Sequence, residues 1–155
     1  MKPKIGELAP AFNVAAVGGT YAEGARVSLA DLRGKKVVLV FYPKDNTPGC
    51  TVQACSIRDN WSQLDGKAHV FGVSVDDVAS HQKFIDHKKL PYPLLSDVDQ
   101  ELVNAYGVWK EKSMFGKKFM GIERSTFVID AEGRLETVLE KANPLTHLSK
   151  LLEVL

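Results

Sequence analysis

The apolar run at residues 37–42 (VVLVFY) most strongly limits the folds open to this chain. Both of its alternating faces are apolar, apart from the hydroxyl of Tyr42. A strand of this kind needs cover on both faces, as in the middle of a sheet with helices packed on either side. Segments with helical spacing of apolar residues separate it from three further strand-like segments, at 69–75, near 94–95 and at 126–130. Strands that alternate with helices predict an α/β fold.

Turn residues and helix caps predict the remaining elements. Glycines between 18 and 24 indicate a turn between two N-terminal β segments, and Ser28 caps a short helical piece that Gly34 ends. A turn at 131–133 predicts an antiparallel hairpin with a strand at 134–140, whereas helical crossovers make parallel pairs, so the sheet should be mixed. We expect helices at 50–66, 77–88, 97–106 (capped by Asp97 or Asp99) and 143–155 (capped by Asn143, with Pro144 in first position).

Length, charge and hydropathy place the chain among ordinary globular proteins. Its 155 residues show no repeat, linker or break in composition, so we expect one domain over 1–155. The net charge of +1 creates no global field that would attract nucleic acid or an anionic membrane. No apolar run approaches the roughly 20 residues that cross a bilayer, and prolines interrupt the N-terminal segment where a signal peptide needs apolar residues. These features predict a soluble, cytoplasmic protein.

Cys50 follows a turn-rich loop, PKDNTPG, that leaves the carboxyl end of the expected central strand. Ligands of open α/β sheets bind at that end of the strands. The free N–H groups and partial positive charge at the start of a helix stabilise a thiolate, which is the nucleophilic form of cysteine. The position therefore favours a reactive thiol over the alternative, a buried and inert core cysteine.

Cys55 lies five residues further on, a spacing that does not suit a disulfide within a helix. On an intact α-helix the two Cα atoms would be roughly 8.6 Å apart, beyond the about 7 Å that a disulfide tolerates. The thiols could join only after the first turns unwind, which would make the redox state a conformational switch. From spacing alone, two unrelated thiols are an equal alternative. Two cysteines are also too few for a secreted disulfide scaffold.

The chain offers only a weak zinc site. Cys50 and Cys55 with His81 and His87 would supply four ligands, but no loop-like knuckle surrounds either pair. We therefore expect neither a metal nor a cofactor. The other two histidines are expected to be surface or hydrogen-bonded residues, at positions 69 and 147.

Three aromatic residues fall in an expected apolar and basic loop at about 109–119. They are Trp109, Phe115 and Phe119. Packing in the core or within the loop is favoured for them over a place on the rim of the site.

The stretch FYPKDNTPGCTVQACSIRDN contains Pro43-x-x-x-Thr47-x-x-Cys50, which resembles the signature of the peroxiredoxins. The offset to Cys55 and the segment GVWKEKSMFGKKFMGIERSTFVID are similar to the bacterioferritin-comigratory (Bcp) or PrxQ subfamily, and GELAPAF near the N-terminus matches as well. The resemblance implies a thioredoxin-like fold with a central mixed β-sheet flanked by helices and an N-terminal β-hairpin. It also implies a thiol peroxidase that reduces hydrogen peroxide and organic hydroperoxides in antioxidant defence.

The same resemblance assigns roles to individual residues. Cys50 would be the peroxidatic cysteine, whose thiolate attacks a peroxide oxygen and becomes a sulfenic acid. Thr47 would hydrogen-bond the thiolate and the peroxide, and Pro43 would shield the site from water. Arg124 would hold the thiolate anionic and stabilise charge that develops on the peroxide oxygens. A guanidinium and a helix N-terminus both favour a thiolate, and fixed donors lower the energy of such a transition state.

Cys55 occupies the resolving position used by many members of the subfamily. The resemblance implies an intramolecular Cys50–Cys55 disulfide after local unfolding, reduction by thioredoxin or glutaredoxin, and a monomer. Two other functions compete with this one. A thiol switch that exposes a partner surface would also use the five-residue offset, whereas a disulfide reductase is disfavoured because the chain has no Cys-x-x-Cys.

Overall fold

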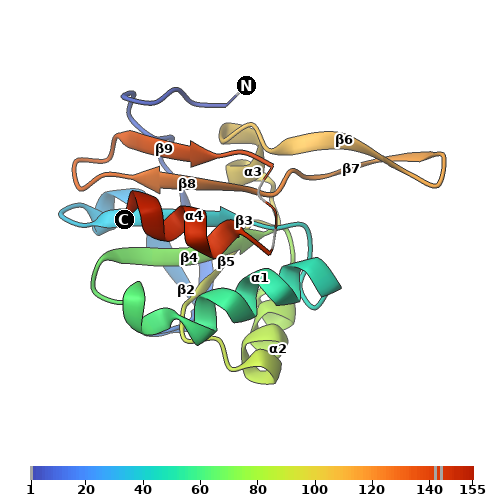
Figure 1. Ribbon diagram of the computed structural model, residues 1–155, viewed down its shortest axis with the longest axis horizontal. Helices are drawn as coiled ribbons and strands as arrows, with labels where there is room; N and C mark the ends of the chain where they lie inside the picture. The colour runs from blue at the N-terminus through green and yellow to red at the C-terminus, as the bar shows by residue number, and fades with distance from the viewer. Residues whose placement is uncertain (1, 142, 144) are drawn as a thin grey trace.

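The chain forms a seven-stranded mixed sheet and a separate two-stranded ribbon in the computed structural model, which describes residues 2–141, 143 and 145–155 (Figure 1). The strands are β1 (Asn13–Gly18), β2 (Tyr21–Ser28), β3 (Lys36–Phe41), β4 (Ala68–Ser74), β5 (Leu94–Ser96), β6 (Trp109–Met114), β7 (Lys117–Ile122), β8 (Ser125–Ile129) and β9 (Leu135–Leu139). The sheet has the order β2-β1-β5-β4-β3-β8-β9, and β6 pairs with β7. The β3–β4 and β4–β5 pairs are parallel and the others antiparallel, so the mixed sheet and the N-terminal hairpin are confirmed.

β3 lies inside the sheet and is covered on both faces, as its apolar run predicts. Val37, Leu39 and Phe41 pack into one hydrophobic cluster together with the N-terminal segment. Val38 and Val40 point the other way, into a second cluster. β3 therefore contributes to both cores and lies between β4 and β8 in the sheet.

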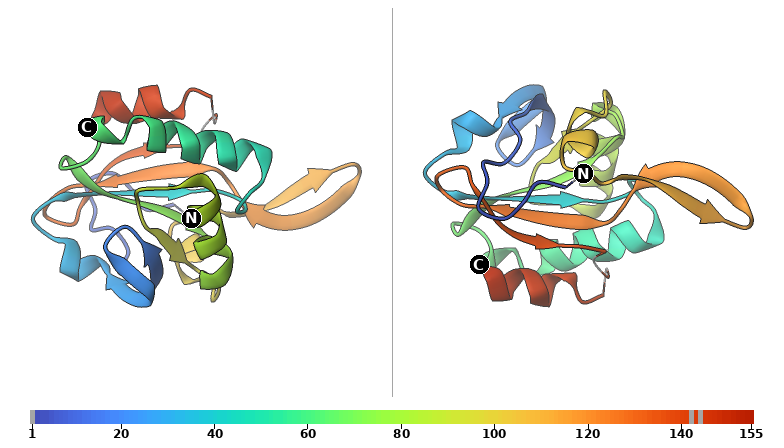
Figure 2. Two further views of the ribbon diagram at one scale, coloured as in Figure 1. Left: turned by 90° about the horizontal axis from the view of Figure 1, so that it is seen from below. Right: turned by 90° about the horizontal axis from the view of Figure 1, so that it is seen from above.

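Four α-helices are seen in the described residues: α1 (Pro48–Asp59), α2 (Val78–Lys88), α3 (Glu101–Ala105) and α4 (His147–Val154). α1 and α4 lie side by side on one face of the sheet (Figure 2). Their apolar side chains, with those of α2, fill the second cluster, whereas α3 packs into the first. No helix in this part of the chain is both long and apolar enough to span a membrane.

The ends of several elements differ from the prediction. α1 starts two residues before Cys50 because Pro48 takes the first helical position, and it ends at Asp59 rather than at 66. Asn60 ends it by donating its side-chain amide to the carbonyl oxygen of Ser56, and a short 3-10 turn follows at 61–63. Gly24 lies within β2, so the expected turn is shorter and consists of Gly19 and Thr20, between β1 and β2.

The caps of the two later helices are partly as predicted. Asp97, not Asp99, accepts from the backbone N–H groups that open α3, those of Leu102 and Val103. α4 begins at residue 147 instead of following Asn143 directly. Asn143 still caps the preceding turn, because its side chain accepts from the N–H of residue 145. The predicted role of Pro144 lies outside the described residues.

The ribbon of β6 and β7 replaces the predicted loop and projects from the globular part of the molecule (Figures 1 and 2). Its turn is formed by Phe115 and Gly116, both with positive φ, where a two-residue hairpin usually has Asn-Gly. Trp109 packs against the core, but Phe115 at the tip is 97% exposed and Phe119 is also exposed. Packing is therefore confirmed for the first aromatic residue and wrong for the other two.

Candidate active site

The pairing of β3 with β8 creates the site. Because the two strands are antiparallel, the start of β8 lies beside the end of β3, with Phe41 opposite Ser125. Arg124 directly precedes β8, and the loop after β3 leads within a few residues into α1. Two segments that are more than seventy residues apart in sequence thus bring Cys50 and Arg124 together.

Cys50 is a free thiol in the first turn of α1 and is only 2% exposed. An Nη2 hydrogen of Arg124 is donated to its Sγ, with 3.2 Å between the heavy atoms. The first turn of a helix also holds N–H groups without carbonyl partners and carries partial positive charge. The Cys50 sulfur therefore faces a charged N–H donor and the partial positive charge of the helix start.

Gln53 is the residue of the site that sequence reasoning missed. It lies one helical turn after Cys50, is buried, and accepts a hydrogen bond at Oε1 from Nη1 of Arg124. One guanidinium therefore bridges two side chains of α1, and Gln53 orients it toward the sulfur. Its own Nε2 has no hydrogen-bond partner among the described residues. The sequence did contain one indication of this role: Gln53 is a polar residue three positions after Cys50, which places it on the same face of the helix.

Thr47 and Pro43 lie on the loop between β3 and α1, and both are half-buried. Thr47 is the cap residue of α1, but its hydroxyl donates to the carbonyl oxygen of Lys44 at 2.9 Å and does not cap the helix through its side chain. Its backbone carbonyl accepts from the N–H of Thr51 and starts the helical ladder. The hydroxyl oxygen keeps its lone pairs free to accept a further hydrogen bond.

Cys55 is half-buried and free, and it lies in the same unbroken helix as Cys50. It lies beside Tyr92: burial first, and then the charge of Cys55, raise the pKa of the tyrosine, so that its hydroxyl stays protonated. That hydroxyl donates to the carbonyl oxygen of Ala54 at 3.3 Å. The helical spacing keeps the two sulfurs apart, as the sequence predicts.

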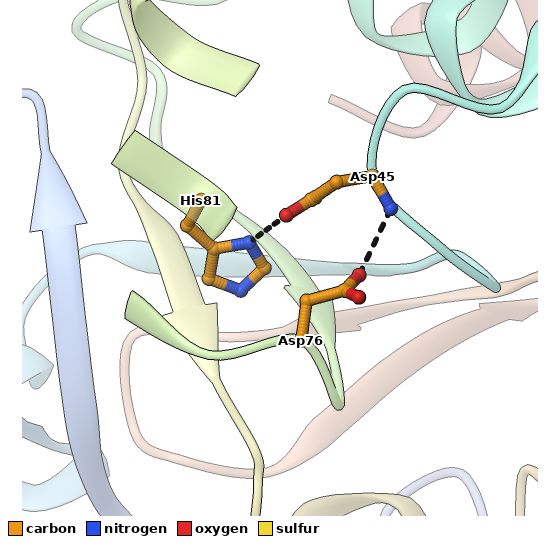
Figure 3. A group of neighbouring side chains, drawn as sticks. All are labelled: Asp45, Asp76 and His81. Atoms are coloured by element: carbon orange, nitrogen blue, oxygen red, sulfur yellow. Dashed lines mark hydrogen bonds and ion pairs between the residues drawn. The ribbon is translucent and has the colours of Figure 1, made fainter. Parts of the chain in front are cut away.

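The loop that carries Thr47 is held by a buried polar network around Asp45 (Figure 3). The carboxylate of Asp45 accepts from the hydroxyl of Tyr42 at 2.6 Å, from Ser80 at 2.8 Å and from Nδ1 of His81 at 2.8 Å. Its backbone N–H donates to the carboxylate of Asp76 at 2.9 Å. The network fixes the path of the loop between β3 and α1.

This network also decides against the zinc site. Nε2 of His81 hydrogen-bonds the carbonyl oxygen of Leu95 at 2.9 Å, so both of its ring nitrogens are engaged away from the cysteines. Within the described residues, the cluster with possible metal ligands is Asp45, Asp76 and His81, and it contains neither thiol. Hydrogen bonds already occupy these side chains, so the cluster fits a structural role.

Replacing Asp45 by Ala should lower the free energy of unfolding by about 3 kcal/mol, because two buried donors and the half-buried Ser80 would lose their acceptor. Denaturant unfolding at neutral pH measures the difference. Asp99→Ala is the matched control: this carboxylate is exposed, and we expect a change within about 0.5 kcal/mol. Equal stability of the two variants would contradict the role given to Asp45.

His147 is a second buried histidine near the site. It opens α4, its Nε2 lies 2.7 Å from Oγ1 of Thr126, and its Nδ1 finds no partner among the described residues. Burial first, and then the positive charge of Arg124, lower its pKa to about 4. The ring is therefore neutral at physiological pH. His147 is buried and not on the surface, but because only one of its two nitrogens is hydrogen-bonded in the described part of the chain, the expectation of a hydrogen-bonded residue holds in part.

The lowered pKa of His147 predicts acid sensitivity. An unfolded chain takes up the proton near pH 6.5, whereas the folded chain does so only near pH 4, so the free energy of unfolding falls as the pH decreases between these values. Relative to His147→Gln, the natural protein should lose about 2 kcal/mol more between pH 7.5 and pH 5. Urea unfolding of both proteins at the two pH values measures this. Parallel losses would contradict the assignment.

The fold and the site together define a class: an α/β protein with a buried free thiol in the first turn of a helix and a guanidinium donating to its sulfur. The comparisons with known proteins agree. The chain belongs to the AhpC/TSA family, whose model matches residues 5–138. Within the family it falls in the Bcp/PrxQ subfamily of peroxiredoxins, and it is a thiol peroxidase.

Relatives and solved structures cover nearly the whole chain. A putative peroxiredoxin Bcp of Coxiella burnetii is 46% identical over 97% of both chains, and peroxiredoxin Bcp of Bacillus subtilis is 47% identical over 85% of both. The crystal structure of a Xylella fastidiosa PrxQ variant superposes with a TM-score of 0.89 at 31% identity, covering 99% of this chain and 95% of the other. The expected thioredoxin-like peroxiredoxin fold is thereby confirmed.

Proposed function

We propose that this protein reduces hydrogen peroxide and organic hydroperoxides with Cys50 as the peroxidatic thiol and Cys55 as the resolving thiol. One observation carries the proposal: the guanidinium of Arg124 donates to the buried sulfur of Cys50 at the head of α1. A bacterioferritin-comigratory protein of Xanthomonas campestris, 34% identical with a TM-score of 0.82, has alkyl peroxide reduction activity, which supports the organic substrates.

In the first step the Cys50 thiolate attacks one oxygen of the hydroperoxide. A sulfur–oxygen bond forms, the oxygen–oxygen bond breaks, and the leaving oxygen takes up a proton as water or an alcohol. The sulfur is oxidised to a sulfenic acid and the peroxide is reduced. Arg124 serves this step because its N–H groups already point at the sulfur and can follow negative charge onto the departing oxygen.

Thr47 and Pro43 complete the proposed site from the loop before α1. The hydroxyl of Thr47 donates to Lys44, so in this arrangement it serves an approaching hydroperoxide as an acceptor for the peroxide hydrogen. Pro43 adds an apolar ring without an N–H donor, and we assign it the exclusion of water from the thiolate. Less water around the sulfur strengthens its interaction with Arg124.

The second step requires the start of α1 to unwind. The free-energy cost of this unwinding is small because few side chains pack there. Between residues 48 and 52 only Cys50 is buried; Pro48 and Val52 are exposed. Few apolar contacts are lost when such a turn opens, so it belongs to the least stable part of the fold. Oxidation of the sulfur also replaces the thiolate that Arg124 binds, which weakens the bridge to α1.

The rest of α1 is held more firmly. Arg58 donates to the carbonyl oxygen of Lys88 at 2.6 Å, and Trp61, just after the helix, stacks on Tyr92 with 5.8 Å between ring centroids. We infer that the first turns open while this end stays in place. Cys55 then attacks the sulfenic sulfur, the disulfide forms, and the hydroxyl group leaves as water.

The catalytic cycle closes when an external dithiol reduces the disulfide. We assign this role to thioredoxin or glutaredoxin in the cytoplasm, through exchange at the Cys50–Cys55 bond. The site groups named above, Cys50, Gln53, Cys55 and Arg124, come from one chain. This supports a monomer as the active form.

Cys55→Ser should separate the two steps. The first oxidation of Cys50 by peroxide should stay within about threefold of the natural rate, because Cys55 does not contact the first-turn thiol across the helix. Turnover with thioredoxin should fall by at least about 100-fold, because the resolving thiol is gone. Stopped-flow oxidation and steady-state turnover measure the two steps. Normal thioredoxin-dependent turnover would show that Cys55 does not resolve the sulfenic acid.

The function itself is tested by peroxide-dependent oxidation of reduced thioredoxin. The natural protein should consume one thioredoxin dithiol for each hydrogen peroxide over many turnovers. Consumption of a single equivalent, followed by arrest in the presence of excess reduced thioredoxin, would favour the competing thiol-switch function. Reduction of insulin without any peroxide consumption would instead support a disulfide reductase.

A further inference from the structure

An open hollow of about 310 Å³ adjoins Arg124 at the base of the β6–β7 ribbon. It lies at the small end of the range for ligand sites. Its wall is formed by Lys110, Glu111, Lys112, Glu123, Arg124 and Lys141. Four cationic and two carboxylate side chains therefore line the hollow. One of them, Arg124, also donates a hydrogen bond to Cys50.

Both carboxylates of the hollow already have cationic partners from outside it. Lys2 lies 2.5 Å from the carboxylate of Glu123, and Lys118 lies 3.7 Å from that of Glu111. Burial works to raise the pKa of Glu123, but Lys2, and Lys110 at longer range, outweigh it and lower the pKa. The wall therefore carries four positive and two negative charges, a net charge of +2, and Lys2 and Lys118 offset its two carboxylates from outside.

The three lysines, in contrast, lack such partners. In the described part of the chain, no carboxylate oxygen lies within 4 Å of Nζ of Lys110, Lys112 or Lys141. Lys112 is half-buried, and burial first, and then the charge of Arg124, lower its pKa by more than the charges of Cys50 and Glu123 raise it. Two like charges, one of them partly desolvated, are held side by side, an arrangement that a bound anion would relieve.

We propose that this hollow is a subsite for the carboxylate of an anionic hydroperoxide. The carboxylate would bind Lys112, with Lys110 and Lys141 at the rim, while the hydroperoxide group of the same molecule reaches Arg124 and Cys50. Arg124 lines the hollow and also donates to the Cys50 sulfur, so a molecule that contacts Lys112 and this guanidinium would extend from the hollow toward the thiol. The inference rests on the proposed peroxidase function and adds a preferred substrate class.

A matched pair of substrates tests the subsite: a tertiary hydroperoxide whose chain ends in a carboxylate, and its methyl ester. The rate of Cys50 oxidation by each, measured by stopped flow, gives an acid-to-ester ratio. We expect a ratio of roughly five in the natural protein, falling toward one in Lys112→Gln and at high salt. Taking the ratio cancels any direct effect of Lys112 on the thiolate, since both substrates meet the same sulfur.

Lys117→Gln is the control, because this exposed lysine lies on the same ribbon but outside the hollow. Its ratio should equal that of the natural protein. A ratio of one in the natural protein, or a ratio unchanged in Lys112→Gln, would overturn the subsite. If hydrogen peroxide still oxidised Cys50 at the normal rate, the proposed peroxidase function would be unaffected by that result. Failure of every peroxide to oxidise Cys50 would overturn both. An effect of Lys112→Gln confined to reduction by thioredoxin would mark a protein contact and also overturn the subsite.

Discussion

Cys50→Ser should reduce peroxide consumption to background, a loss of at least about 1,000-fold in the second-order rate. A serine hydroxyl is not ionised at neutral pH, and it offers neither a thiolate for attack nor a sulfur that can be held as a sulfenic acid. The substitution is nearly isosteric at a buried position, so the fold should persist. Peroxide disappearance in the presence of reduced thioredoxin measures the loss.

The control for this prediction is Cys55→Ser, which removes the other thiol and leaves the peroxidatic one. That variant should still react once with peroxide, whereas Cys50→Ser should not react at all. If Cys50→Ser kept a fast reaction and Cys55→Ser lost it, the roles of the two thiols would be reversed.

Arg124→Gln should lower the rate of Cys50 oxidation by about 100- to 1,000-fold, since it removes a positioned, charged donor next to the reacting sulfur. Gln keeps part of the hydrogen-bonding capacity but carries no charge and does not reach as far. Competition kinetics or stopped flow with hydrogen peroxide measures the change.

Arg124→Lys separates charge from geometry. A lysine restores the positive charge but is a point charge that lacks the planar fork with which Arg124 bridges Gln53 and Cys50. We expect it to recover only part of the lost rate. Exposed Arg134, distant in the fold, provides the control, and Arg134→Gln should react at the natural rate. A natural rate in Arg124→Gln would contradict the role of the guanidinium.

The fold could be predicted where the spacing of apolar residues along the chain shows which faces of a strand or helix are buried. The run at 37–42 places β3 inside the sheet because both of its faces are apolar, and the structure covers both. The meeting of Cys50 with Arg124 was not predictable from spacing, because it depends on the antiparallel pairing of β3 with β8. Only the resemblance to a known family connected the two residues beforehand.

Gln53, the β6–β7 ribbon and the Asp45 network depend on tertiary contacts that the order of residues in the sequence does not indicate. A glutamine within a helix usually lies on the surface, so the sequence gives no reason to expect Gln53 to be buried. Its burial is explained by the contact with Arg124. The β6–β7 ribbon was missed because Phe115 stands at a turn position that usually carries Asn, and because lysines and apolar residues alternate weakly around it. The Asp45 network joins three segments whose spacing carries no motif.

Peptide mapping after a single oxidation tests the central claim most directly. The reduced protein is treated with one equivalent of hydrogen peroxide, blocked, digested and analysed by mass spectrometry. The account predicts one species in which the peptide that carries both Cys50 and Cys55 has lost two hydrogens through an internal disulfide, and a trappable sulfenic acid on Cys50 in Cys55→Ser. A sulfenic acid that persists on Cys50 while Cys55 is present and free would contradict it.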